Sequence, residues 1–131
     1  MIHEKIVNSP INSRIIKWAA VLCYASLIFY MSSLSASPHA LAPFFMFDKV
    51  LHFFEYGIFG FLLYFALAGE RWEGKPLLPA FMIGSIYGIS DEFHQYFVPT
   101  RECDVFDFLA DAAGSGSGAF FASFMSRGRA H

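Results

Sequence analysis

The chain of 131 residues is rich in apolar side chains: 56% of its residues are hydrophobic, 19% are aromatic and only 15% are charged. Soluble domains carry about a quarter charged residues, so this composition and the positive mean hydropathy of +0.45 indicate that lipid is the main solvent. The net charge of −2 argues against a nucleic-acid partner, because a phosphate-binding surface needs a basic excess.

Four stretches of the sequence predict helices that cross a membrane. A bilayer core of about 30 Å needs about 20 mostly apolar residues in a helix. Pro76 and Pro79 introduce the third stretch, where a helix start needs no backbone donor, and the fourth is rich in small residues. We therefore expect an all-α fold, a bundle of four transmembrane helices in a single domain. The predicted spans are about 15–34, 50–68, 77–98 and 105–125, within a domain that covers residues 1–131.

The distribution of basic residues predicts how the bundle is oriented. Cytoplasmic loops carry an excess of Lys and Arg. Seven of the nine Lys and Arg residues fall on the side of the two termini, and only Lys49 and Arg101 fall on the other. Both termini should therefore be cytoplasmic, with the loops 35–49 and 99–104 outside. The seven basic residues are Lys5, Arg14, Lys17, Arg71, Lys75, Arg127 and Arg129.

The outer loop before the second span, SASPHALAPFFMF, is unusually apolar. Pro38 and Pro43 interrupt it, so we expect it to lie in the membrane interface with Phe44, Phe45 and Phe47 in contact with lipid. These phenylalanines would anchor the bundle, or alternatively contact a lipid-like substrate.

Ionisable residues within the predicted spans gather at one depth. Each costs on the order of 2.5–3.5 kcal/mol to insert, so such residues normally face the bundle interior and mark a functional site. At a rise of about 1.5 Å per residue, Glu55, Asp91 and Asp111 each lie roughly 10 Å below the outer boundary. Three separate spans thus agree on depth, which predicts a shared polar site near the outer face.

Helical spacing predicts which faces of the third and fourth spans form this site. Each span has one stripe with small residues in its inner half and polar residues in its outer half. Small residues let membrane helices approach closely, so we expect helix contacts below and an outward-opening polar cleft above. His52 and Glu55 share a face of the second span and can line the same cleft. The stripes are Gly84, Gly88, Asp91 and Gln95, and Asp107, Asp111, Gly114 and Gly118.

The outer zone contains more acids than bases. Raised carboxylate pKa values, protonated histidines or a bound cation can relieve such an imbalance. Several members also have structural interpretations: Asp48 and Asp104 precede helices and could cap them, and His94 lies off the stripe in the interface. Asp91 is favoured over Glu92, because the two point about 100° apart on a helix. The acids against Lys49 and Arg101 are Asp48, Glu55, Asp91, Glu92, Glu102, Asp104, Asp107 and Asp111.

The residues interpreted as functional fall into three groups, for which a structural ion-pair network is the alternative interpretation. Burial could raise the pKa of Glu55 or Asp91 towards that of a general base, and Arg101 could pair with a phosphate or carboxylate. The cofactor is unknown, and a divalent metal such as zinc or manganese is one alternative. The catalytic candidates are Glu55, Asp91 and Asp107, the ligand-binding candidates are His52, Gln95, Arg101 and Asp111, and the metal candidates are His52, Glu55, Asp91 and Asp107.

Three motifs together resemble the VanZ-like family: the segment from Asp48 to Tyr56, the segment from Ser90 to Arg101, and Asp104 and Asp107 before a glycine-rich helix. The resemblance implies a multi-pass protein of a bacterial cytoplasmic (inner) membrane. The family's founding member is associated with low-level resistance to the lipoglycopeptide teicoplanin. Asp111 stands where related sequences are expected to carry Asn, so this site is one acid richer than the family pattern implies.

Three classes of function remain open from the sequence. The leading hypothesis is a site that binds or acts on a lipid-like or amphiphilic cell-envelope ligand from the outer leaflet, with glycopeptide resistance as a consequence. The second is a proton- or ion-coupled transporter, which one four-helix chain could build only as a homodimer, with contacts through the glycine stripes. The third is a binding module that sequesters a lipoglycopeptide or a cell-wall precursor without catalysis.

Overall fold

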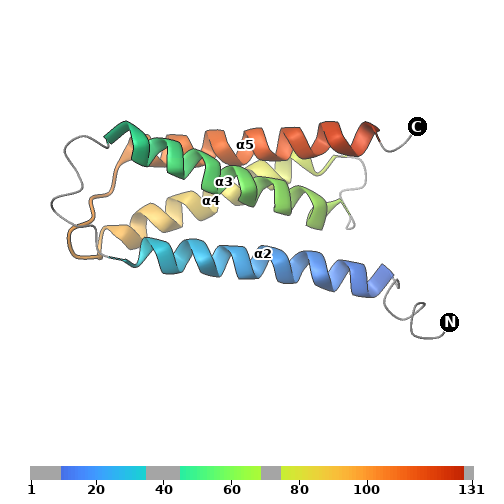
Figure 1. Ribbon diagram of the computed structural model, residues 1–131, viewed down its shortest axis with the longest axis horizontal. Helices are drawn as coiled ribbons and strands as arrows, with labels where there is room; N and C mark the ends of the chain where they lie inside the picture. Colours follow the sequence, from blue (N-terminus) through green and yellow to red (C-terminus); the bar gives the residue numbers. More distant parts are fainter. Residues whose placement is uncertain (1–9, 35–44, 69–74, 129–131) are drawn as a thin grey trace.

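The computed structural model describes residues 10–34, 45–68 and 75–128, and within these ranges the protein is all-helical, with no strand. Figure 1 shows an elongated bundle in which successive helices run in opposite directions. The start of the first helix and the end of the last therefore lie at one end, here called the terminal end, and the segment 96–104 lies at the other, the loop end. The helices are α2 (Pro10–Ser32), α3 (Phe45–Leu67), α4 (Leu77–Gln95) and α5 (Val105–Gly128).

All four predicted helices are present, and several of their ends differ from the prediction by one to five residues. Two of these differences affect the site. Helix α4 stops at Gln95 rather than at Val98, because the following Pro99 disfavours a helical conformation at Val98. The chain then reverses at Thr100, whose φ is 68°. Helix α3 begins at Phe45, so Asp48 lies inside its first turn. The prediction that Asp48 precedes a helix and caps it is therefore wrong.

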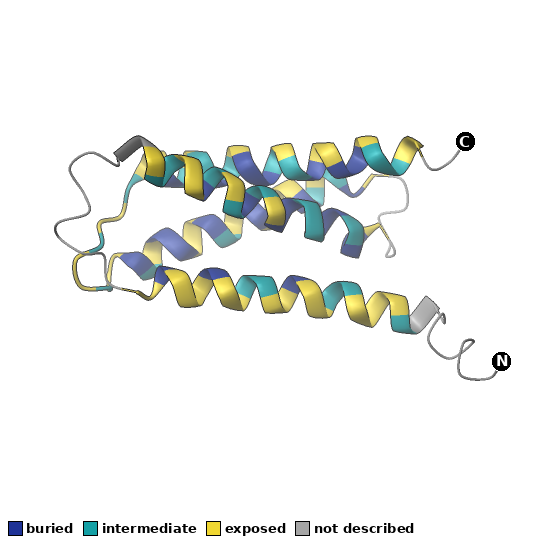
Figure 2. Cartoon of the chain, viewed as in Figure 1, coloured by how far each residue is buried: buried dark blue, intermediate teal, exposed yellow. Residues whose placement is uncertain are grey.

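The outside of the bundle is apolar. Large side chains such as Phe54, Ile86 and Phe124, on three different helices, are 63%, 61% and 69% exposed, and exposed residues cover the outer faces of all four helices (Figure 2). Apolar patches of this extent mark contact with lipid or with another protein. Helices α2 and α3 contain stretches that are long and apolar enough to cross a membrane, Asn12–Ser32 and Phe47–Leu67.

Helices α3 and α5 approach each other backbone to backbone. A Cβ atom at Gly114 would overlap the carbonyl oxygen of Phe53, and one at Gly118 would overlap that of Gly57. Only glycine permits this close approach, which is also seen in the small-residue interfaces of membrane helices. The contact fixes the depth of α5 relative to α3, and hence the position of His52 on α3 relative to Asp107 and Asp111 on α5.

The glycines of α4 are also buried, against neighbouring helices of the same bundle. A Cβ atom at Gly84 would overlap the Ser115 side chain, and one at Gly88 would lie 3.0 Å from the Cβ of Asp111. The predicted glycine stripes are therefore confirmed as helix contacts, but within one chain. Neighbouring helices already contact these stripes, so they are not free to form the contacts of a homodimer; the homodimer itself stays a prediction.

Helix α2 flanks the other three and is held mainly by side chains. Val21 and Ile28 are buried against the bundle. The hydroxyl of Tyr24 donates to the carbonyl oxygen of Glu55 at 3.2 Å, and the hydroxyl of Tyr87 donates to that of Ala25 at 2.7 Å. Helix α2 thus supports α3 and α4 without contributing an acid to the polar site.

Several predicted features lie outside the described residues. They include the apolar loop with Pro38, Pro43 and Phe44, and the basic residues Lys5, Arg71 and Arg129. The side chain of Phe45 is likewise not described, whereas Phe47 is 55% exposed. The predicted interfacial position of this loop, and the cleft that it would border, remain predictions.

Candidate functional site

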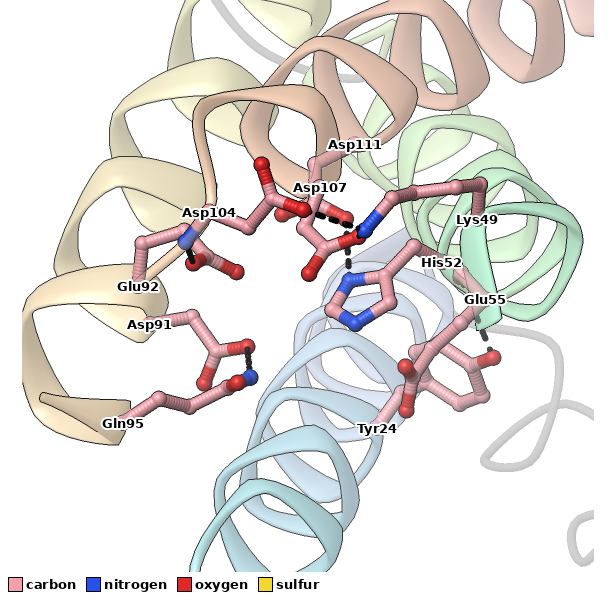
Figure 3. A network of polar contacts seen from close by, with 10 residues as sticks. All are labelled: Tyr24, Lys49, His52, Glu55, Asp91, Glu92, Gln95, Asp104, Asp107 and Asp111. Atoms are coloured by element: carbon pink, nitrogen blue, oxygen red, sulfur yellow. Dashed lines mark hydrogen bonds and ion pairs between the residues drawn. The ribbon is translucent and has the colours of Figure 1, made fainter. Parts of the chain in front are cut away.

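Buried polar side chains collect at the loop end of the bundle. Figure 3 shows them converging from α3, α4 and α5. We call this set the acidic site. The polar stripes predicted on α4 and α5 are both buried, as is His52 of α3. The acidic site consists of Lys49, His52, Asp91, Glu92, Gln95, Asp104, Asp107 and Asp111.

Lys49 joins α3 to the start of α5. Its Nζ lies 2.6 Å from Asp104 Oδ2 and also bonds Asp107 Oδ1. Asp104 caps α5, because its Oδ1 accepts the backbone N–H of Phe106 at 2.8 Å. The predicted cap at this position is confirmed. The bond from Lys49 and the bond from the Phe106 amide hold the pKa of the Asp104 carboxyl below its usual value.

His52 and Asp111 form a second buried pair between α3 and α5. His52 Nδ1 lies 2.8 Å from Asp111 Oδ1, and Asp111 is completely buried. The other carboxylate oxygen, Asp111 Oδ2, has no hydrogen-bond partner among the described residues. A buried carboxylate oxygen without a partner is costly, so this atom is available to a ligand.

Helix α4 contributes two acids rather than one. Asp91 accepts a hydrogen bond from Gln95 Nε2 at 3.2 Å. Glu92 Oε2 accepts the backbone N–H of Asp104 at 3.0 Å, while Glu92 Oε1 is buried and unpartnered within the described chain. The prediction that Asp91 rather than Glu92 faces the site was wrong about Glu92, because the segment 96–104 folds back over α4 and buries a second face of the helix.

Glu55 and Arg101 lie at the edge of this arrangement. Glu55 is half-buried on α3 below His52 (Figure 3), and its carboxylate forms no hydrogen bond within the described ranges. The Nε of Arg101 donates to the carbonyl oxygen of Leu34 at 3.1 Å. His94 contacts α2 instead of the site, with Nε2 at 3.0 Å from Ser33 Oγ, as expected for a residue off the polar stripe.

Two sets of side chains are spaced to hold a metal ion. In each set, one potential ligand atom from each of three residues lies within 4.8 Å of the others. The first set is Asp48, His52 and Asp107, and the second is His52, Glu92 and Asp111. Of the residues predicted as metal ligands, His52 belongs to both sets and Asp107 to one, whereas Glu55 and Asp91 belong to neither.

Sequence reasoning left four members of this region out of the candidate site. Lys49 was counted only as a charge, Asp104 was interpreted as a helix cap, Glu92 was rejected on helical projection, and Tyr56 was not considered. The hydroxyl of Tyr56 is buried and has no partner in the described part of the chain. It lies beside Gly88 and Asp111, because a Cβ at Gly88 would be 3.4 Å from its ring. The spacing of Tyr56 four residues after His52 could have indicated a shared face.

The terminal end of the bundle has a different character. A groove of about 510 Å³ lies between α4 and α5 and has apolar walls. Two cations line it, Lys75 before the start of α4 and Arg127 near the end of α5. Both cations are exposed, unlike the buried charges of the acidic site. The lining residues are Lys75, Leu77, Leu78, Phe81, Gly116, Phe120 and Arg127.

Comparison with known proteins places the chain in one family. The family described as VanZ/LLP1 matches residues 17–126, which is most of the chain and includes the whole acidic site. The chain therefore belongs to the VanZ/LLP1 family. No match was found among curated proteins, and none among solved structures.

Proposed function

We propose that this member of the VanZ/LLP1 family crosses a bacterial cytoplasmic membrane four times, with its termini inside, and uses an outward-facing acidic site to bind or act on a lipid-like or amphiphilic cell-envelope ligand. The observation that carries the proposal is a pair of buried oxygens with no partner among the described residues, Glu92 Oε1 and Asp111 Oδ2, inside a bundle whose outer surface is apolar. Such atoms need a polar partner, and an amphiphile could supply one.

Charge asymmetry along the bundle supports the orientation. The basic residues Arg14, Lys17, Lys75 and Arg127 belong to the terminal half, and the acids of the described residues belong to the loop end. An excess of basic residues favours the cytoplasmic side. The acidic site would then lie near the outer face, where envelope precursors and lipoglycopeptides are found.

The two free cysteines allow the orientation to be tested with the native chain. Cys103 is exposed in the segment before α5, and Cys23 is exposed in the middle of α2, where it would face lipid. A membrane-impermeant maleimide added to spheroplasts should label Cys103 and leave Cys23 unlabelled. Desolvation and neighbouring acids raise the pKa of the Cys103 thiol, so the reaction is run at about pH 8.5, near the ordinary thiol pKa. Labelling of Cys103 only after lysis would overturn the orientation.

The ligand-binding part of the proposal is tested with teicoplanin as a probe. Purified protein in liposomes should bind labelled teicoplanin, and Asp91→Asn should weaken binding at least about tenfold, because a charge-assisted hydrogen bond is worth about 1.5–3 kcal/mol. Asn can still accept the bond from Gln95, so the variant should fold. Glu102→Gln, which removes an exposed acid next to the site, is the matched control. Absence of binding by the wild-type protein would remove teicoplanin as the ligand.

The same preparation separates a binding module from an enzyme or a carrier. Chemically unchanged, surface-bound ligand indicates sequestration, a new ligand mass indicates catalysis, and ligand in the liposome lumen indicates transport. Resistance should follow: a sensitive host that expresses the wild-type protein should tolerate more teicoplanin than one that expresses Asp91→Asn at an equal level.

A further inference from the structure

We infer that His52, Glu92 and Asp111 form a binding site for a divalent transition-metal ion, of the class of Zn²⁺ or Mn²⁺. The inference deepens the proposed function, on which it rests, by naming a cation that the same site would hold. It stands on the geometry of three side chains from three different helices.

The three side chains are buried and mutually close. His52, Glu92 and Asp111 are 6%, 4% and 0% exposed, and one nitrogen or oxygen of each lies within 4.8 Å of the other two. Because they come from α3, α4 and α5, the helix contacts at the glycine stripes fix their separation before any ion binds. Preorganised ligands of this kind are what a metal site requires.

Two oxygens of this set have no partner that would compete with a metal. Glu92 uses Oε2 to accept the Asp104 amide and leaves Oε1 unpartnered, and Asp111 uses Oδ1 towards His52 and leaves Oδ2 unpartnered, as judged over the described ranges. Each carboxylate is thus held by one oxygen and offers the other. A hydrogen bond to the oxygen that does not bind the metal orients a carboxylate ligand.

The alternative set of Asp48, His52 and Asp107 is less suited to a cation. Lys49 Nζ already bonds Asp107, so a positive charge occupies that position. Asp48 is only half-buried. No lysine or arginine bonds Glu92 or Asp111 in the described part of the chain, so a metal ion at this set would not compete with a fixed cation.

The donor chemistry selects the class of ion. One imidazole with two carboxylates suits Zn²⁺ or Mn²⁺, whereas Mg²⁺ and Ca²⁺ favour oxygen ligands alone. Three protein ligands leave a coordination position for water or for an oxygen of an envelope ligand.

The test uses the metal alone as its probe. Wild-type protein purified in detergent, stripped with chelator and titrated with Zn²⁺ and Mn²⁺, should bind one ion per chain by calorimetry and by elemental analysis. Glu92→Gln should lower the affinity at least about 100-fold, because loss of a direct ligand exceeds the 10–100-fold effect of an outer-shell partner. Gln retains an acceptor for the Asp104 amide, so this variant keeps the bond that supports the local fold.

Two matched variants distinguish the site from general attraction of cations to acids. Asp48→Asn removes a carboxylate from the alternative set, and Glu102→Gln removes an exposed one. Both should bind the metal as the wild-type protein does. Equal loss in Glu92→Gln and Asp48→Asn, or a stoichiometry near zero for the wild type, would overturn the inference.

Failure of the metal site would not imply failure of the proposed function. If stripped wild-type protein binds no ion but still binds labelled teicoplanin, the metal inference is wrong and the ligand-binding proposal stands. If the ion binds stoichiometrically and teicoplanin does not bind in its presence or absence, the metal site stands and the ligand must be another amphiphile.

Discussion

Helix α5 and helix α2 are attached to α3 in different ways. Helix α5 meets α3 along the backbone, through glycines without which the helices would collide, and through two sets of buried polar bonds at the loop end. Helix α2 rests on its neighbours through apolar side chains and tyrosine hydroxyl groups. The pair α3–α5 therefore sets the geometry of the acidic site, and α2 stabilises the bundle without defining the site.

The largest effect should come from separating α3 and α5. Gly118→Ala places a methyl group on the carbonyl oxygen of Gly57, and backbone on both sides leaves no flexible side chain to move. We expect a loss of about 3 kcal/mol or more in unfolding free energy, at the upper end for overpacked cores. Gly128→Ala, where a Cβ meets no atom within 4 Å, is the control. Thermal unfolding in detergent measures both. Equal melting temperatures would contradict the close approach.

The next effect should come from removing the cation between the same helices. Lys49→Met leaves Asp104 and Asp107 without their shared partner, and Asp107 is nearly buried. Loss of one partner of a buried ion pair costs about 3–5 kcal/mol; we expect about 3 kcal/mol, since Asp104 is partly exposed. Lys75→Met, at the exposed rim of the groove at the terminal end, should change stability by less than about 0.5 kcal/mol. Similar losses from the two substitutions would show that Lys49 is no more than a surface charge.

A smaller effect is expected at α2. Tyr87→Phe removes the hydroxyl that donates to the Ala25 carbonyl at 2.7 Å but keeps the ring. A single neutral hydrogen bond contributes about 1 kcal/mol, so the melting temperature should fall modestly and metal binding should not change. Tyr30→Phe, on the exposed face of α2, should leave both unchanged. A loss of metal binding in Tyr87→Phe would mean that α2 helps to shape the acidic site after all.

The helices and most of the buried polar positions could be predicted from the sequence, because both depend on local pattern. Apolar length predicts a helix, and the spacing of Asp91 with Gln95 and of Asp107 with Asp111 predicts which faces are buried. Glu92 could not be found in this way. Its burial depends on a reversal at Thr100 that carries the backbone of Asp104 back over α4, and helical projection contains no information about such a contact.

The pairing of the charged residues could not be predicted from the sequence either. The sequence shows that acids exceed bases in the outer zone, but a count does not say which acids Lys49 neutralises. That choice follows from the start of α3 at Phe45, which places Lys49 within reach of the start of α5. Composition therefore predicts that the acids need compensating positive charge. The described contacts indicate which carboxylates lack a lysine or arginine partner.

The smallest effect concerns the pH dependence of the link between α3 and α5. Lys49 and the Phe106 amide lower the pKa of Asp104 from its ordinary value of 3.8. The folded protein therefore binds the Asp104 proton more weakly than the unfolded chain does. The bond between Lys49 and Asp104 contributes fully to the stability above about pH 3.8, and this contribution is lost as the pH falls through the lowered pKa. Because the carboxylate is partly exposed, the change should be below about 1 kcal/mol.

Unfolding of the wild-type protein and of Asp104→Asn in detergent, between about pH 5 and pH 2, measures this difference across the range in which the lowered pKa titrates. The wild-type protein should lose more stability than the variant over this range, since Asn has no proton to gain. Asn can still accept the Phe106 amide, so the cap is retained and only the charge is removed. If the two curves remain parallel down to the acid limit, Lys49 stabilises the start of α5 through Asp107 alone, and the coupling of α3 to α5 at the loop end depends on that one carboxylate.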